Sequence, residues 1–168
     1  RRLEAEIVRD AILSVSGRLD ETQFGPGTLD ETMKRRSIYF MVKRSRLIPS
    51  MVIFDAPDSL QGIALRPSTT VAPQALWLLN NQNVLECARA FAAGVCPNSG
   101  TPPRDAVTAA YLTALGRKPG AQELADTLQF LQHQTAAYAA GGDKDPARSA
   151  LADVCQVLLG LNEFIYVD

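Results

Sequence analysis

The chain has 168 residues, of which 46% are apolar and 21% are charged. Its 17 basic and 18 acidic residues leave a net charge of −1, so the apolar content is too high and the charge too small for an intrinsically disordered protein. No apolar run approaches the roughly 18–20 residues that a membrane-spanning helix needs. The near-neutral charge also removes the electrostatic case for binding nucleic acid or anionic lipid. A globular domain remains, long enough to bury about 70% of its unfolded surface in one core.

The first part of the chain combines a helix, a loop and a strand. Apolar side chains recur every four positions over residues 3–15, which predicts an amphipathic helix. Gly17 suits the left-handed conformation that follows a helix end, and Gly25-Pro26-Gly27 is typical of a loop. Residues 38–42 are mostly β-branched or aromatic and lie between basic pairs, so they predict a short strand that is covered on both faces.

Short helices and a long loop are expected in the middle of the chain. Pro49 can open a short helix, and residues 59–70 have the composition of a loop. The pattern becomes helical again at Pro73. Asn80-Asn81 interrupts it, so we expect two helices here, of which the second ends near Gly94.

The last part of the chain is predicted to be helical. Residues 97–103 are rich in proline, glycine and polar residues and therefore predict a linker. Three helices follow, the first ending at Gly116 and the second at Gly141-Gly142. The third begins with Asp145 as its N-cap and Pro146 at its first position.

The tail, residues 164–167, leaves two alternatives open: a last helical turn, or a strand that pairs with residues 38–42. In both cases the pattern predicts a mainly α fold, an irregular multi-helix bundle with at most one short two-stranded β element. We expect residues 1–168 to form a single domain with a soft internal boundary near residues 97–104. Because the helical pattern follows Arg1 directly, any targeting segment is expected to lie before it.

Three cysteines, Cys87, Cys96 and Cys155, lack the spacing of a redox pair, a haem attachment site or a zinc site. If one helix carried Cys87 and Cys96, they would lie about 13 Å apart, which is beyond the reach of a disulfide. A disulfide between Cys96 and Cys155 is conceivable. The alternative is that all three are small buried hydrophobic residues.

The sequence offers little support for catalysis. Its single histidine, His133, lies opposite the apolar stripe of its helix and is best interpreted as a solvated side chain. The motifs of serine hydrolases, P-loop proteins and zinc proteases are absent. The single tryptophan, Trp77, has aliphatic neighbours and is predicted to lie in the core rather than to stack on a sugar.

The richest polar stretch runs from residue 55 to residue 81 and contains the first candidate site. Two carboxylates three residues apart could pair with an arginine, bind a ligand, or hold a hard cation such as calcium. The alternative is structural: these side chains would cap short helices and tie a long loop to the core. The candidate ligand-binding residues are Asp55, Asp58, Arg66, Thr70 and Gln74. No metal site is predicted.

A second candidate site consists of the basic residues that flank the predicted strand: Arg35, Arg36, Lys43 and Arg44. They could bind an anionic partner, such as an acidic polysaccharide or a neighbouring acidic domain. The alternative is a solvated flank that prevents an edge strand from pairing with other chains.

Several segments together resemble one family, in the family's order and over essentially the whole chain. They are Arg2-Leu3-Glu4-Ala5-Glu6, Arg9-Asp10-Ala11, Arg35-Arg36-Ser37-Ile38-Tyr39, Val42-Lys43-Arg44, Phe54-Asp55-Ala56-Pro57-Asp58, Arg66, Ser68-Thr69-Thr70-Val71, Gln74-Ala75-Leu76, Leu79-Asn80, Tyr111, Ala114-Leu115-Gly116-Arg117, Pro119 and Asn162-Glu163-Phe164-Ile165-Tyr166-Val167-Asp168. This pattern resembles the C-terminal part of a planctomycete-specific domain of unknown function, which occurs in large exported bacterial proteins.

The resemblance implies a setting rather than an activity. Such proteins often also carry a c-type cytochrome module and a second uncharacterised domain. The resemblance therefore implies an exported, for example periplasmic, parent protein in which part of the same domain precedes Arg1 and Asp168 lies near the end. It brings no catalytic residue to this chain.

These observations favour a non-catalytic helical interaction or scaffolding module of a larger exported protein, beside a cytochrome c-type or carbohydrate-handling part. Its expected partners are the upstream domains of that protein and an acidic polysaccharide, and neither nucleic acid nor a membrane span is expected. No cofactor is expected in this chain, although haem c could be bound elsewhere in the parent. The alternative is a ligand-binding or hydrolytic unit that uses the polar loop 55–74 and is completed by upstream sequence.

Overall fold

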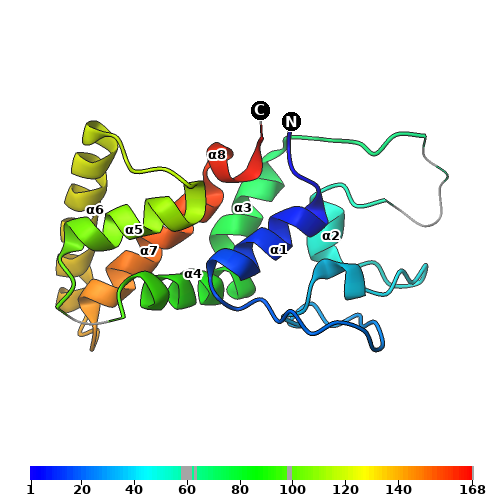
Figure 1. The fold of residues 1–168 in the computed structure, drawn as a ribbon, viewed down its shortest axis with the longest axis horizontal. Helices are drawn as coiled ribbons and strands as arrows, with labels where there is room; N and C mark the ends of the chain where they lie inside the picture. Colours follow the sequence, from blue (N-terminus) through cyan, green and yellow to red (C-terminus); the bar gives the residue numbers. More distant parts are fainter. Residues whose placement is uncertain (58–61, 63, 98–99, 168) are drawn as a thin grey trace.

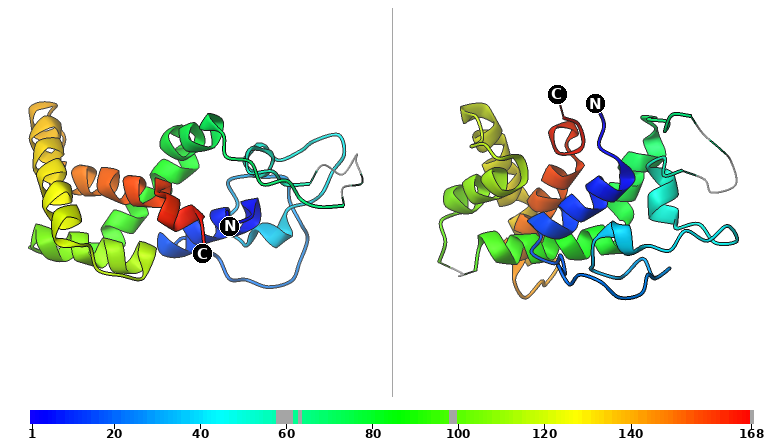
Figure 2. Two further views of the ribbon diagram at one scale, coloured as in Figure 1. Left: turned by 90° about the horizontal axis from the view of Figure 1, so that it is seen from above. Right: turned by 45° about the vertical axis from the view of Figure 1, so that its right-hand side comes forward.

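The computed structural model describes residues 1–57, 62, 64–97 and 100–167. This part of the chain is mainly helical and contains isolated bridges but no sheet, which confirms the predicted fold class (Figures 1 and 2). The elements are α1 (Ala5–Val15), the 3-10 helix η1 (Ser37–Tyr39), α2 (Pro49–Ile53), α3 (Ala72–Asn80), α4 (Gln82–Val95), α5 (Pro103–Leu115), α6 (Ala121–Ala140), α7 (Pro146–Gly160) and α8 (Asn162–Ile165).

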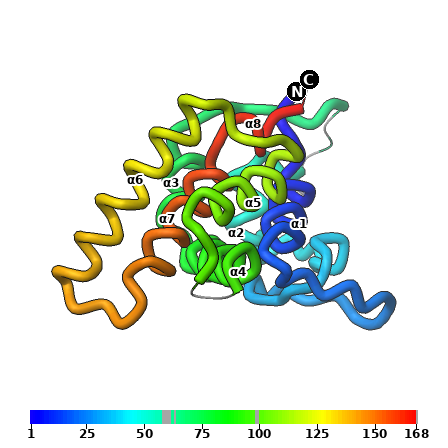
Figure 3. Tube along the Cα trace, turned by 60° about the vertical axis from the view of Figure 1, so that its left-hand side comes forward, coloured from blue at the N-terminus to red at the C-terminus, as the bar shows by residue number. Residues whose placement is uncertain are grey.

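Helix α7 is the centre of the helical half of the molecule. It packs against α4 and α6 along most of its length and also contacts α3, α5 and α8. Its apolar stripe is buried as the sequence predicts, from Leu151 to Leu158. In Figure 3, α6 runs along one edge of the molecule. No helix of the described residues is long and apolar enough to cross a membrane.

The irregular half is built around α1, which contacts α2, α4 and η1. The segments between α1 and α2 lie on the side away from α6 (Figure 1). The predicted stripe of α1 consists of Leu3, Ile7, Ala11 and Val15, widened by Val8 and Ile12, and it is most deeply buried on its Val8 and Ile12 side. The residues it buries include Ala5, Val8 and Ile12, whereas Ile7 is half exposed. A neighbour fixes which face of a helix is buried, and spacing alone does not identify that neighbour.

The prediction of a strand at residues 38–42 is wrong. The backbone forms η1 instead, in which the amides of Tyr39 and Phe40 donate to carbonyls three residues earlier. Only an isolated bridge joins Phe40 to Thr28. A run of β-branched and aromatic residues becomes a strand only beside a partner strand, and no extended partner lies next to this segment within the described residues.

The tail forms a last helical turn, α8, and of the two alternatives this one is correct. Beyond it, Tyr166 forms an isolated antiparallel bridge with Arg2 rather than with residues 38–42. The amide of Leu3 donates to the carbonyl of Ile165 at 2.8 Å. The two ends of the chain therefore lie side by side (Figure 3).

The remaining core predictions can be compared directly with the structure. Cys87 and Cys155 are buried, and no disulfide joins Cys96 to Cys155. Burial raises the pKa of the Cys155 thiol, which makes it unreactive. His133 is exposed on α6, as predicted. Trp77 is half buried and packs edge-to-face on Phe54, with 5.4 Å between the ring centroids.

Candidate functional site

The polar stretch that the sequence singles out folds into one cluster around Asp55. This residue follows α2 in a left-handed conformation, with φ of 62°, and its carboxylate accepts hydrogen bonds from Thr69 and Arg2. The amide of Thr69 donates to it at 2.7 Å and the hydroxyl of Thr69 at 2.9 Å. Nη2 of Arg2 completes the set at 2.7 Å.

Arg2 lies at the centre of this cluster, although it is not among the predicted site residues. Its side chain is only 4% exposed. Besides Asp55, it donates to the carbonyl of Phe54 at 3.0 Å and to that of Thr69. The guanidinium also lies 5.9 Å from the centroid of the Phe54 ring. One arginine thus joins the start of the chain, the end of α2 and the loop before α3.

Arg66 ties the same loop to α1. Its Nε donates to the carbonyl of Asp55 at 3.1 Å. Its two terminal nitrogens pair with Glu6 at 2.8 Å and with Glu4 at 3.4 Å. All three of its nitrogen atoms are therefore used within the chain.

The other predicted residues are also bonded internally. Gln74 is buried, donates to the carbonyl of Ile53 at 3.0 Å and accepts from the amide of Val71 at 3.3 Å. The hydroxyl of Thr70 lies 2.6 Å from that of Tyr166. Asp58 lies outside the described residues. The structure thus brings Asp55, Arg66, Thr70 and Gln74 into one region, where each of them has an internal partner.

The electrostatics of Asp55 match this geometry. Burial by itself raises the pKa of its carboxyl group, but the hydrogen bonds from Thr69 and Arg2 outweigh burial and lower it. The carboxylate is therefore ionised at neutral pH and surrounded by donors. A general base needs a lone pair that faces a substrate, whereas these oxygens face the backbone and Arg2. Within the described residues, no group of three or more His, Cys, Asp or Glu side chains could hold a metal ion.

The four basic residues of the second predicted site separate into two pairs. Arg35 stacks on Tyr39, with 3.5 Å between its guanidinium carbon and the ring centroid, and donates to carbonyls of the 22–26 loop. Arg36 lies 3.6 Å from a carboxylate oxygen of Asp10. Both therefore serve as internal contacts. Lys43 and Arg44 are exposed, and neither forms an ion pair with any residue in the part of the chain that the structure describes.

A second arginine outside the predicted site residues, Arg9, fixes the loop around η1. Its side chain is buried, and its guanidinium carbon lies 4.6 Å from the centroid of the Phe40 ring. The guanidinium donates to the carbonyls of Met33 and Arg35. Burial lowers the pKa of its guanidinium, while Asp10 opposes that shift. The sequence holds one signal for it: Arg9 follows Ala5 by one helical turn and so shares the apolar face of α1.

An apolar groove of about 560 Å³ lies between α1, η1, residues 40–48 and α2. Its floor includes the buried Ile48 and Met51. Unusually for the surface of a folded chain, its walls carry large apolar side chains that are exposed to solvent. These are Ile7, Ile38, Met41, Val42, Leu47 and Val52. We call this feature the apolar groove.

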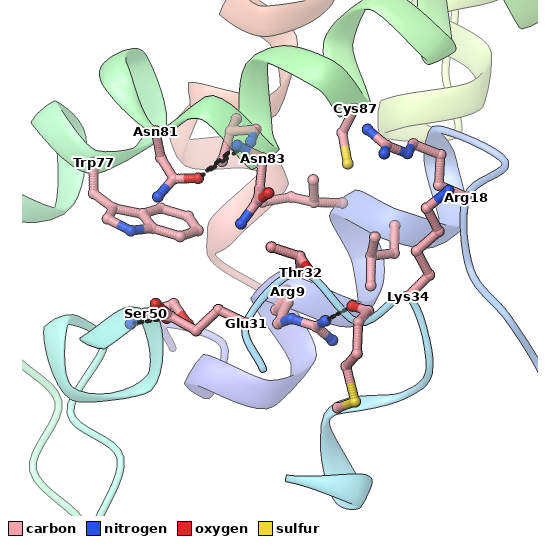
Figure 4. A pocket seen from close by; sticks show the side chains of 14 residues that line it. Arg9, Arg18, Glu31, Thr32, Lys34, Ser50, Trp77, Asn81, Asn83 and Cys87 are labelled. Atoms are coloured by element: carbon pink, nitrogen blue, oxygen red, sulfur yellow. Dashed lines mark hydrogen bonds between the residues drawn. The ribbon is translucent and has the colours of Figure 1, made fainter. Parts of the chain in front are cut away.

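A second cavity, beneath α3 and α4, is far smaller. Figure 4 shows Trp77, Asn81 and Asn83 facing Glu31 and Ser50 across it. The carboxylate of Glu31 accepts from the amide of Ser50 at 2.8 Å, and Asn81 caps α4. Its volume of about 40 Å³ has room for water, whereas pockets for small molecules usually measure about 300–1,000 Å³.

Residues 1–131 match the model of the PSD1 family, which is described as a protein of unknown function (DUF1553). The chain belongs to this family. No curated protein and no solved structure matches it. The match to PSD1 includes the Asp55 cluster and the apolar groove and ends within α6, so α7 and α8 lie beyond it.

Proposed function

We propose that this chain is a non-catalytic interaction module of a larger exported planctomycete protein. In that protein it would hold upstream domains together, beside a c-type cytochrome or a carbohydrate-handling part. The observation that carries the proposal is the apolar groove. Contiguous exposed apolar surface is unfavourable in water, and on folded domains it commonly marks a contact with another protein.

The polar cluster also supports a non-catalytic role, because its charged groups are already bonded within the chain. The carboxylate of Asp55 and the guanidinium of Arg66 are bonded to backbone groups and to opposite charges of the same chain. Such pairs fix the path of irregular loops. Ala56 and Pro57, which follow Asp55 directly, line one end of the groove. The polar cluster therefore fixes that part of the surface, and the apolar residues contact the partner.

The proposal is tested with the whole chain, immobilised, and the remaining domains of its parent protein in solution. We expect a complex that Val42→Asp weakens at least tenfold, because a charge would then be buried against the partner. Leu65→Asp is the matched control: Leu65 is 86% exposed and lies outside the groove, and Val42 is 82% exposed within it. No complex, or equal effects of the two substitutions, would exclude this function.

One observation favours a second candidate, a site for a small anion. Nε of Arg2 is buried and has no hydrogen-bond partner among the described residues. Beside Arg2 lies a cavity of about 300 Å³ that Arg1, Arg66 and Ser68 also line. An oxyanion there would compete with Glu4 for Arg1 and with Glu4 and Glu6 for Arg66.

Calorimetric titration with inorganic phosphate tests this second candidate. Binding should release heat that Arg66→Met reduces and that Arg104→Met, at an exposed arginine outside the cavity, leaves unchanged. The absence of binding heat at millimolar phosphate would remove the candidate and would leave the interaction module unaffected.

A further inference from the structure

The two sides of the apolar groove differ in their free charge. On the α1 side lie Glu4, Glu6 and Asp10. The first two pair with Arg66 at 3.4 and 2.8 Å, and Glu4 also pairs with Arg1 at 3.2 Å. Asp10 accepts from the amide and the hydroxyl of Ser37, each at 2.7 Å, and has Arg36 3.6 Å away. The carboxylates of this side are therefore already neutralised from within the chain.

The opposite side presents cations that have no such partner. Lys43 and Arg46 both line the groove, and neither has a carboxylate of another described residue within ion-pair distance. The charge of Arg46 acts on Asp30 only at longer range. A tight turn holds them next to each other, because the amide of Arg46 donates to the carbonyl of Lys43 at 3.0 Å and the two residues form an antiparallel bridge. Val42 and Leu47 flank this turn, so the free positive charge borders directly on exposed apolar surface.

We propose that the groove binds an amphipathic segment that carries apolar and acidic side chains. The inference rests on the proposed interaction function and names the chemistry of the partner. The apolar side chains of the segment cover Ile38, Val42 and Val52, and its carboxylates pair with Lys43 and Arg46. Charge complementarity of this kind selects partners and orients them more than it adds affinity.

An acidic polysaccharide fits the same cations but not the rest of the surface. It would leave the side chain of Ile38, which is 76% exposed, in contact with water. A peptide segment removes this apolar area from water and pairs the charges at the same time. The polysaccharide is therefore an outcome of the test rather than the proposal.

The first experiment measures binding of three labelled helical peptides to the whole chain by fluorescence anisotropy. Each peptide has leucine on one face, and the other face carries glutamate, glutamine or lysine. We expect the affinity to fall in that order and the glutamate peptide to weaken as the ionic strength rises to about 0.5 M, where charges are screened within a few ångströms. Equal affinities, or tightest binding of the lysine peptide, would overturn the proposal.

Variants then locate the contact. The double substitution Lys43→Glu/Arg46→Glu should weaken the glutamate peptide about tenfold, since two attractive exposed pairs become repulsive. The same variant should strengthen the lysine peptide. The matched control is Arg104→Glu/Lys144→Glu, at exposed cations remote from the groove, and it should change neither peptide. Equal effects of the two double variants would contradict the proposal.

Binding experiments with the upstream domains of the parent protein distinguish a failure of this inference from a failure of the proposed function. A complex with the upstream domains that depends on Val42 but not on Lys43 and Arg46 would overturn the acidic partner and leave the interaction module in place. If no complex forms, the proposed function fails, and the acidic partner fails with it. Tighter binding of polygalacturonate than of the glutamate peptide, insensitive to Val42→Asp, would replace the peptide by a polysaccharide.

Discussion

Arg2 and Arg9 supply hydrogen-bond donors to backbone carbonyls in the loops, where no regular secondary structure supplies them. Each is buried and donates to two backbone carbonyls that lie in irregular segments. A buried carbonyl without a donor is costly, and irregular backbone has no ladder to supply one. The positive charge is balanced in each case by a neighbouring carboxylate, Asp55 or Asp10.

We expect Arg2→Met to lower the free energy of unfolding by about 3–5 kcal/mol, because it leaves the carboxylate of Asp55 and two carbonyls without their buried donor. Urea denaturation followed by the fluorescence of Trp77 measures this change. Arg1→Met is the matched control. Arg1 is 78% exposed and pairs with Glu4 on the surface, so its loss should change stability by less than about 1 kcal/mol. Similar losses for both variants would show that Arg2 does not organise the cluster.

The same residues show what sequence can and cannot reveal about a site. Asp55, Arg66 and Gln74 stand out because polar residues are concentrated in one stretch, and the structure does gather them. Arg2 lies 53 positions from Asp55 in the sequence, and no spacing rule relates the two residues. A local pattern therefore locates the cluster, but the residue at its centre is set by the tertiary fold.

At the scale of elements, the helices follow from local chemistry. Asp145 caps α7 by accepting from the amide of Arg148 at 3.2 Å, and Pro146 follows at the first helical position, as the sequence predicts. Asn81 ends α3 and begins α4. Caps are encoded by adjacent residues and can be read from them. The segment at residues 38–42 differs, because a strand depends on a distant partner.

Asn81→Ala should lower the free energy of unfolding by about 1 kcal/mol, since its side chain accepts from the amides of Asn83 and Val84 at the start of α4. Asn81→Asp retains an acceptor and should preserve stability. The neighbouring Asn80→Ala serves as control, because that exposed side chain only donates to the carbonyl of Leu76, and we expect less than about 0.5 kcal/mol. Thermal unfolding of the three variants shows whether stability depends on the cap at Asn81 or equally on both asparagines.

Replacing two helix-end glycines by alanine should change the free energy of unfolding in opposite directions. Gly116 ends α5 with φ of 70°, so Gly116→Ala should destabilise by about 1–2 kcal/mol through backbone strain alone. Gly160 is the last residue of α7, has no left-handed φ, and a Cβ there would meet open space. Gly160→Ala should therefore stabilise by about 0.5–1 kcal/mol. The difference between their urea midpoints checks both, and a shared sign would contradict the argument.

The whole molecule joins two regions of different construction. In one, helices pack around α7 through apolar contacts; in the other, loops around α1 are held by arginines and form the apolar groove. The match to PSD1 ends before α7, yet α3, α4 and α5 all pack on that helix. The family part of this chain therefore completes its core with residues beyond the match.

Acid should destabilise the whole molecule, because carboxylates with lowered pKa values are spread over both regions. They are Asp20, Asp30, Asp55, Glu86, Glu123 and Glu163. Hydrogen bonds from Arg117 and from the amide of Gly120 lower the pKa of Glu123 to about 2. In the unfolded chain such groups titrate near pH 4. As the pH falls from there towards 2, the unfolded state binds more protons, so stability is lost over that range.

Urea midpoints measured from pH 7 down to pH 2 check this expectation. The midpoint should change little above about pH 5, where these carboxylates are ionised in both states, and fall steadily below pH 4. Asp153 opposes the trend, since burial raises the pKa of its carboxyl group and protonation relieves that penalty. Arg117→Met removes the guanidinium that pairs with Glu123 and Glu163 and should make the acid loss shallower, whereas Arg104→Met should leave it unchanged. A midpoint that rises on acidification would mean that the ion pairs do not stabilise the fold.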